Sequence, residues 1–209
     1  MIDESRKWDR PGVRAAAHFI TLCMSQLSGI VTLNYDLLVE YALGSKGFNY
    51  GSFGKVLQGR GPYPVSQWRN PVALRGRLPL VKLHGSISWD ATGKYTDGRR
   101  GLGGKALIVT PTPEKRVPAE LQEQWNLSST ILRRASRLLV FGFGFNDYDQ
   151  AVLAHLAEEG RNLVDVAIID VCSRKEKAMR IWSQAHVRSF QPPPEGLGGL
   201  RGWLIGKGS

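Results

Sequence analysis

Short apolar runs alternate along the chain with longer segments in which apolar residues recur at helical spacing. Four of these runs end abruptly in polar residues or glycine, and they cover residues 29–33, 78–83, 138–141 and 166–169. Short apolar runs between helical segments are typical of buried strands in a parallel sheet. The pattern therefore predicts an α/β protein, with a parallel sheet and helices on both of its faces.

The remaining elements follow from periodicity and from capping signals. Asp36 is placed to cap the helix that follows it, and Asp147 or Asp149 to cap the helix that Gly160 ends. We predict a strand over residues 105–110, a long excursion over 44–79 and a hairpin or disordered turn over 90–105. The predicted helices cover residues 11–26, 37–43, 121–137, 150–159 and 174–184.

The chain is expected to form one domain followed by a tail. Residues 1–190 carry the alternating strands and helices, whereas residues 191–209 are rich in proline and glycine. Such a composition is typical of a linker or a frayed end. The tail contains Trp203, for which the sequence indicates no packing partner.

The polar residues after the four apolar runs are the candidate site. Open parallel sheets bind ligands beyond the carboxyl ends of their strands, so these residues are expected to share one ligand cleft. The group comprises Asn34 and Asp36, then His84 and Gly85, then Gly142, Gly144, Asn146 and Asp147, and finally Asp170.

Each member also has a simpler interpretation. Asn34 could hold a ribose hydroxyl or orient a water, or it could support its own turn. His84 alone among the histidines closes a predicted strand and precedes glycine; it could take a proton at neutral pH or be a structural histidine. Asn146 and Asp147 could bind a ligand at a helix start or only cap that helix. Asp170 could accept a hydrogen bond from ribose or adenine.

The charge of the chain is uneven. The net charge is +10, and no acidic residue occurs from Tyr41 to Trp89. This segment could form a surface for an anionic partner, either a phosphate-bearing cofactor or nucleic acid, or it could be a solvated insertion. Its basic residues are Lys46, Lys55, Arg60, Arg69, Arg75, Arg77 and Lys82, and Tyr50, Phe53, Tyr63 and Trp68 lie among them.

Cysteine content and hydropathy narrow the protein class. Cys23 and Cys172 have no neighbours at metal-ligand spacing, so we expect no zinc site and interpret both as buried thiols. The charged start lacks the apolar stretch of a signal peptide, and no apolar run is long enough for a membrane span. These features predict a cytoplasmic protein.

Three motifs together resemble the sirtuin family, and more closely its bacterial sirtuin-like branch without zinc. The segment from Thr32 to Asp36 is similar to the T-x-N-Y-D motif of that branch. Residues 82–86 are similar to its K-L-H-G-S motif, and residues 141–147 to its G-x-S/G-x-N-D segment. The resemblance covers roughly residues 29–170, with the motifs in the same order.

This resemblance implies a Rossmann-like, doubly wound domain that binds NAD without zinc. The usual activity of the branch is hydrolysis of NAD to nicotinamide and ADP-ribose, and many members are effectors of defence against phage. By carry-over, Asn34 would position the ribose or the attacking water, Asp36 would hold the nicotinamide side or the Asn34 loop, and His84 would be the base. Thr32 and Gly85 belong to the same motifs. The adenosine side would be lined by Gly142, Gly144, Asn146, Asp147 and Asp170.

The chain departs from the family at its beginning. Sirtuins carry a glycine-alanine-glycine loop after their first strand, and no such motif precedes Asn34. The first glycine-rich β–α unit is thus expected to be missing. Three explanations stay open: an amino-terminally incomplete chain, a cleft completed by a partner chain or a homo-oligomer, and an inactive module that binds NAD or ADP-ribose or docks on a partner. Nucleic-acid binding through residues 41–89 is the further alternative.

Overall fold

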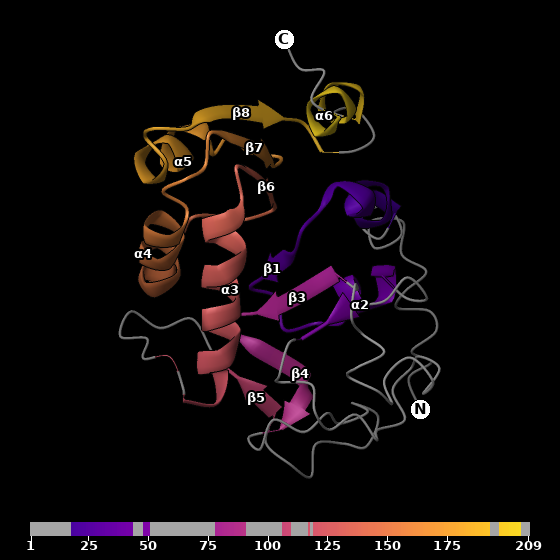
Figure 1. Ribbon diagram of the computed structural model, residues 1–209, viewed down its shortest axis with the longest axis vertical. Helices are drawn as coiled ribbons and strands as arrows, with labels where there is room; N and C mark the ends of the chain where they lie inside the picture. The colour runs from indigo at the N-terminus through magenta and orange to yellow at the C-terminus, as the bar shows by residue number, and fades with distance from the viewer. Residues whose placement is uncertain are drawn as a thin grey trace. The chain divides into compact units, whose positions relative to one another are not determined.

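The computed structural model describes residues 18–43, 48–50, 78–90, 106–109, 117, 119–192 and 197–205. The chain divides into two compact units. Unit 1 consists of Met1–Thr110 with Pro118–Leu127, and unit 2 of Pro111–Val117 with Ser128–Ser209. Each unit combines parallel strands with helices, which confirms the mixed α/β class (Figure 1). The doubly wound arrangement of the whole chain stays a prediction.

Unit 1 contains a parallel sheet of three strands in the order β1-β3-β2, formed by β1 (Ile30–Thr32), β2 (Phe48–Asn49) and β3 (Leu78–Lys82). Strands β1 and β3 pair in a register that sets Thr32 opposite Lys82. Helix α2 (Leu38–Leu43) follows β1. The predicted cap of this helix is confirmed, because Asp36 Oδ1 accepts a hydrogen bond of 2.9 Å from the Leu38 amide.

A two-stranded antiparallel sheet follows directly, formed by β4 (Gly85–Asp90) and β5 (Ala106–Ile108). Strand β5 was predicted, but β4 was not. Its apolar residues Ile87 and Trp89 alternate with serines, which is the pattern of a strand. The strand was not predicted because the residues after His84 were interpreted as the polar end of the preceding run. Residues 91–105, the predicted turn, and residues 51–77, most of the predicted excursion, lie outside the described residues.

The first helical segment and helix α3 complete the described part of unit 1. Residues 18–23 are helical, and the 3₁₀ turn η2 (Met24–Gln26) ends that segment. The earlier part of the predicted helix, residues 11–17, lies outside the described residues. The 3₁₀ turn η7 (Ala119–Leu121) leads into α3 (Gln122–Arg134), whose later residues belong to unit 2.

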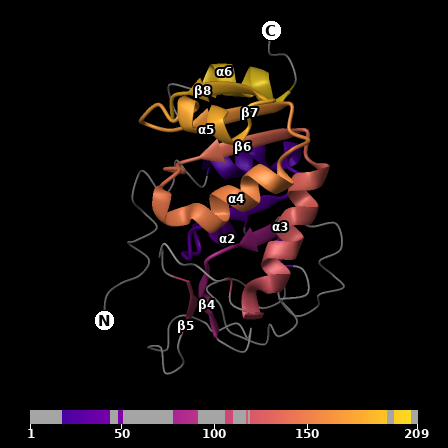
Figure 2. The ribbon, with the colours of Figure 1, turned by 90° about the vertical axis from the view of Figure 1, so that its left-hand side faces the viewer.

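Unit 2 is built on a second parallel sheet, in the order β6-β7-β8. Helices α4 and α5 lie on one side of these strands (Figure 1, Figure 2). Helix α4 has its predicted bounds, whereas α3 and α5 end sooner than predicted. The elements are β6 (Arg137–Phe141), η8 (Asp147–Asp149), α4 (Gln150–Glu159), β7 (Asp165–Ile169), α5 (Lys175–Ile181) and β8 (His186–Phe190).

Strand β8 corrects the prediction that β7 is the last strand. It pairs with β7 alone among the described strands and is only half buried, with His186 and Ser189 exposed and Val187 in the core. A short edge strand with charged residues has too few apolar positions for the periodicity to reveal it. Asp170 therefore follows the central strand of this sheet.

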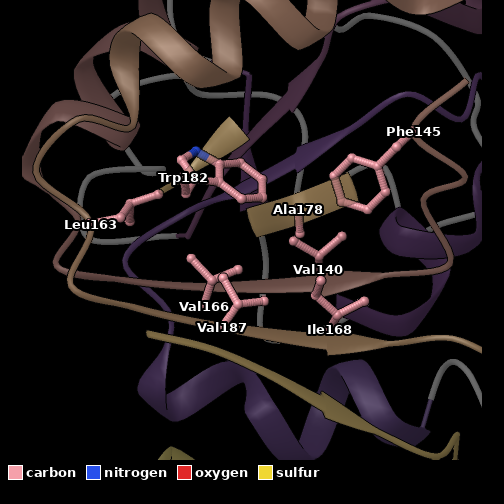
Figure 3. Close-up of a cluster of buried hydrophobic side chains, with 8 residues drawn as sticks. All are labelled: Val140, Phe145, Leu163, Val166, Ile168, Ala178, Trp182 and Val187. Atoms are coloured by element: carbon pink, nitrogen blue, oxygen red, sulfur yellow. The ribbon is translucent and has the colours of Figure 1, made fainter. Parts of the chain in front are cut away.

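The core of unit 2 lies between the sheet and helices α4 and α5. Trp182 is fully buried, and its indole Nε1 donates a hydrogen bond of 3.1 Å to the Leu156 carbonyl. Its ring meets the ring of Phe145 edge-on at 6.1 Å between centroids. Figure 3 shows the cluster, whose members are Val140, Phe145, Leu163, Val166, Ile168, Ala178, Trp182 and Val187.

The predicted tail contains a helix, α6 (Leu197–Leu204), that packs on the beginnings of β6 and β7. Trp203 is 4 % exposed, and its indole Nε1 donates a hydrogen bond of 2.7 Å to Asp165 Oδ2. The guanidinium of Arg137 lies 3.9 Å from the centre of the Trp203 ring and donates to the carbonyls of Trp203 and Leu204. Arg137 therefore satisfies carbonyls at the end of α6, where a positive charge is favourable.

Candidate NAD site

The loop after β1 carries Asn34, and it is tied to the strands on both sides of His84. The backbone amide of Asn34 donates to Thr32 Oγ1 at 3.1 Å, and the backbone amide of Leu83 donates to the Thr32 carbonyl at 3.1 Å. Beyond His84, the Ile87 amide donates to the Tyr35 carbonyl at 2.9 Å. Asn34 itself is exposed. Asn34 and His84 thus follow the carboxyl ends of two adjacent parallel strands.

His84 occupies the turn between β3 and β4 and is only 5 % exposed. Its carbonyl accepts a hydrogen bond of 2.9 Å from the Val109 amide, just beyond β5. The next residue, Gly85, has a φ of 78°, and a Cβ built on it would lie 1.9 Å from the Leu107 carbonyl oxygen. The absence of a side chain at Gly85 thus lets the backbone of β5 approach it closely.

A buried polar network lies under the Asn34 loop. Lys82 is fully buried, and its ammonium donates to Glu40 Oε1 at 2.7 Å and to the Asp36 carbonyl. The Tyr50 hydroxyl donates to the same Glu40 oxygen at 2.7 Å. Gln124 joins the group, because its Oε1 accepts from the Lys82 amide and its Nε2 donates to the Tyr50 carbonyl.

The network corrects two sequence interpretations. Lys82 and Tyr50 were counted in the basic, aromatic segment that could face an anionic partner, but both side chains are buried. They therefore contribute nothing to such a surface. Of the other residues named for that surface, Lys46, Lys55, Arg60, Arg69, Arg75, Arg77, Phe53, Tyr63 and Trp68 lie outside the described residues.

In unit 2, the loop after β6 turns sharply at Gly142 and Phe145. Gly142 has a φ of 64°, and among the described residues beyond its chain neighbours no atom lies within 4 Å of a Cβ built there, so its outer side is open. Phe145 has a φ of 49° and is buried at 2 % exposure, where its carbonyl accepts from Lys177 Nζ at 3.1 Å. The buried ring holds the loop on the core while the backbone at Gly142 faces outward.

Asn146 and Asp149 do not make the predicted side-chain caps. Asn146 precedes η8, and Asp149 precedes α4, but neither side chain forms a capping hydrogen bond. The Asn146 carboxamide is exposed and folds toward Gly144, where a Cβ would lie 3.0 Å from Asn146 Nδ2. Gly144 thus leaves room for the Asn146 side chain. Asp147 is exposed in η8.

Asp170 shapes the turn after β7. Its Oδ1 accepts a hydrogen bond of 3.1 Å from the Cys172 amide, and its Oδ2 lies 3.9 Å from Arg174 Nε. The carboxylate is therefore held by its own turn and by a neighbouring positive charge. Cys172 is exposed, which corrects its interpretation as a buried thiol, whereas Cys23 is buried as expected.

The predicted site residues form two groups. Thr32, Asn34, Asp36, His84 and Gly85 lie together in unit 1, at the ends of β1 and β3. Those of unit 2 lie at the ends of β6 and β7, which pair as parallel neighbours, and they are Gly142, Gly144, Asn146, Asp147 and Asp170.

Within the described ranges, no three His, Cys, Asp or Glu side chains gather where they could hold a metal ion. The helices of the same ranges are all too short or too polar to cross a membrane.

The family comparison agrees with the motifs. The family model of the SIR2-like domain matches residues 28–190, and the chain belongs to this family. SIR2-like domains generally bind NAD, so the chain has an NAD-related, sirtuin-like function. Neither the comparison with curated proteins nor that with solved structures found a match.

The buried network is the feature that sequence reasoning missed. Glu40 and Gln124 were assigned no role, and Lys82 was interpreted only as part of a motif and of the basic segment over residues 41–89. A signal was present, since Lys82 interrupts an apolar run predicted to be a buried strand. A lysine at such a position requires a buried acceptor, and Glu40 on the adjoining helix could have been proposed.

Proposed function

We propose that this protein binds NAD as a substrate and hydrolyses its nicotinamide–ribose bond to release nicotinamide and ADP-ribose. The observation that supports this most directly is the position of Asn34 and His84 beyond two adjacent parallel strands of an SIR2-like domain. Such strand ends are where open α/β sheets bind nucleotides.

The chemistry of the donor set fits a dinucleotide. In this proposal the Asn34 carboxamide holds a ribose hydroxyl or the attacking water, since it offers both a donor and an acceptor. The His84 imidazole takes a proton from a ribose hydroxyl. Asp36, which caps α2, holds the loop of Asn34 in place.

The adenosine half is assigned to unit 2. The open backbone at Gly142 allows close approach of a ligand, and the exposed Asn146 carboxamide offers hydrogen bonds to a ribose. Gly144 keeps the space that this carboxamide occupies, and Asp147 and Asp170 complete the group. A Gly144→Ala variant should displace Asn146 and weaken binding of ADP-ribose, with little change in stability.

The finer assignments rest on the motif resemblance. We place the protein in the zinc-free bacterial branch, with a doubly wound fold, and we assign it a role in antiphage defence through NAD depletion. A homo-oligomer or a partner chain would complete the cleft. Chelators should leave NAD hydrolysis unchanged, because the proposal includes no zinc.

The direct test is incubation of the purified chain with NAD, followed by chromatography for nicotinamide and ADP-ribose. The wild type should release both products in equal amounts. His84→Ala should lower the rate by a factor of about 10²–10⁴, the range for loss of a positioned acid or base. Asn34→Ala should also lower the rate, because it removes the carboxamide that holds the ribose hydroxyl or the attacking water. A wild-type rate that His84→Ala leaves unchanged would remove His84 from the mechanism.

A second candidate is a module that binds NAD or ADP-ribose without turnover. The burial of His84, at 5 % exposure, favours it, because a base must reach the proton that it removes. Calorimetry with ADP-ribose separates the two candidates: binding without product formation supports the module, and product formation excludes it.

A further inference from the structure

Burying the ion pair of Lys82 and Glu40 costs free energy, and apolar side chains could fill the same space without that cost. Both side chains are 1 % exposed, and their charged atoms lie 2.7 Å apart. Removing two charges from water is expensive, and well-packed apolar residues in place of such a pair are often neutral or stabilising. Glu40 Oε2 is buried and has no hydrogen-bond partner among the described residues, which adds to the cost.

The ammonium of Lys82 also makes a contact that an apolar side chain could not make. It donates to the carbonyl of Asp36, the last residue of the Asn34 loop. Glu40, on α2, fixes the direction of the ammonium by accepting its second hydrogen bond. The loop is thereby held at Asp36 by a residue of β3 and at Tyr35 by the Ile87 amide of β4.

These contacts place the two tethers on either side of His84. Lys82 precedes it and Ile87 follows it, so the chain segment that carries His84 also carries the groups that hold the loop of Asn34. Gln124 stiffens the base of this segment, since it accepts from the Lys82 amide at 3.1 Å and donates to the Tyr50 carbonyl at 2.8 Å. Movement of one candidate catalytic group relative to the other is restricted.

We propose that Lys82, oriented by Glu40, is a positioning residue that holds the Asn34 loop against the His84 segment in the geometry required for cleavage of NAD. The proposal rests on the proposed function. Lys82 itself touches neither substrate nor reacting atoms. Removal of the Lys82 side chain should therefore lower kcat and leave KM nearly unchanged. Cleavage of NAD requires a more exact placement of Asn34 relative to His84 than binding of NAD does.

The test uses a variant that removes the pair without leaving a lone charge. Lys82→Met combined with Glu40→Met keeps the interior neutral and similar in volume, but the Tyr50 hydroxyl loses its Glu40 acceptor and the Asp36 carbonyl its Lys82 donor. Unfolding in urea should therefore show a stability within about 3 kcal/mol of the wild type. We expect kcat to fall by a factor of about 10–100, as for the loss of other supporting groups around a site, and KM to stay within about twofold. If this variant does not fold, Lys82→Met with Glu40→Gln replaces it, since Gln keeps an acceptor for Tyr50.

A second readout does not depend on activity. Amide hydrogen exchange over residues 34–38 should be at least about tenfold faster in the double variant, while exchange in β6, β7 and β8 stays as in the wild type. The matched control removes another ion pair, that of Arg133 and Glu159, by changing both residues to glutamine. This control should leave kcat and the exchange of residues 34–38 unchanged.

The outcomes separate the inference from the proposed function. If the wild type does not hydrolyse NAD, the proposed function fails and the exchange data alone decide: faster exchange over residues 34–38 supports the tether, and unchanged exchange overturns it. If the wild type is active, a folded double variant with wild-type kcat overturns the inference and leaves the proposed function intact.

Discussion

Gly85 offers the sharpest prediction about the segment of His84. A Gly85→Ala change places a Cβ 1.9 Å from the Leu107 carbonyl oxygen and 2.9 Å from its carbonyl carbon, both backbone atoms of β5. No rotamer change can relieve this contact, so β4 and β5 must separate. Gly142→Ala is the matched control, because Gly142 also has a positive φ but no atom of the part of the chain that the structure describes, its chain neighbours aside, lies within 4 Å of the added Cβ.

The magnitude follows from two contributions. Both variants carry the cost of a left-handed alanine, about 1–2 kcal/mol. Gly85→Ala should in addition disrupt backbone hydrogen bonds where the strands meet, among them that from the Val109 amide to the His84 carbonyl. Two such bonds at about 1 kcal/mol each bring its total to about 3–4 kcal/mol.

The assay is urea unfolding followed by circular dichroism and tryptophan fluorescence. The expected difference of about 2 kcal/mol between the two variants corresponds to a melting temperature about 4–8 °C lower for Gly85→Ala. Equal losses of stability in the two variants would refute the close approach of β5 to Gly85. In that case the glycine would be required only for its conformation.

Three further predictions concern other parts of the chain. Burial lowers the pKa of His155 below its ordinary value of 6.5, so below that pH the unfolded chain takes up a proton that the folded chain does not. The free energy of unfolding should therefore decline as the pH falls below 6.5. The urea midpoint should decline less between about pH 7.5 and about pH 5.5 in His155→Gln than in the wild type. Trp203→Phe removes the donor to Asp165 but keeps a ring for Arg137, and should cost about 1.5–3 kcal/mol in urea unfolding; a change near zero would contradict the docking of α6. Burial raises the pKa of the Cys23 thiol to about 11, whereas Cys172 is exposed, so a thiol reagent should label only Cys172 until the protein is unfolded.

Four strands of the two parallel sheets were predictable from the sequence. Strands β1, β3, β6 and β7 are short apolar runs that end in polar residues, and helix α4 begins and ends where Gln150 and Gly160 indicated. Local chemistry sufficed here because burial demands apolar side chains and helix ends have strong residue preferences.

The edge strand β8, the hairpin of β4 and β5, and helix α6 were harder to predict from the sequence. Strand β8 has one buried residue, Val187, among its five, which is too weak a pattern to stand out. The docking of α6 depends on Arg137 and Asp165, whose partners lie more than thirty residues away along the chain, as the separations of 66 and 38 residues show. Pairings of this kind follow from the fold and are not visible in local periodicity.

The candidate site likewise has residues that could be predicted from the sequence and residues that could not. The motifs located Asn34 and His84 at strand ends, because the residues after a buried parallel strand are a restricted set. The support beneath them was not found, since it joins Lys82 to Glu40 and Gln124, each 42 residues away. A buried network of this kind is recognised only when the strands and helices that carry it are already assembled.

The most direct measurement is a double-mutant cycle on kcat/KM for NAD, with Asn34→Ala, His84→Ala and the combined variant. Groups that serve one reaction centre have strongly non-additive effects, so the combined variant should lose little more than the worse single variant. If the losses in kcat/KM of the two single variants multiply in the combined variant, the Asn34 carboxamide and the His84 imidazole act independently. That result would contradict a shared NAD site at the ends of β1 and β3.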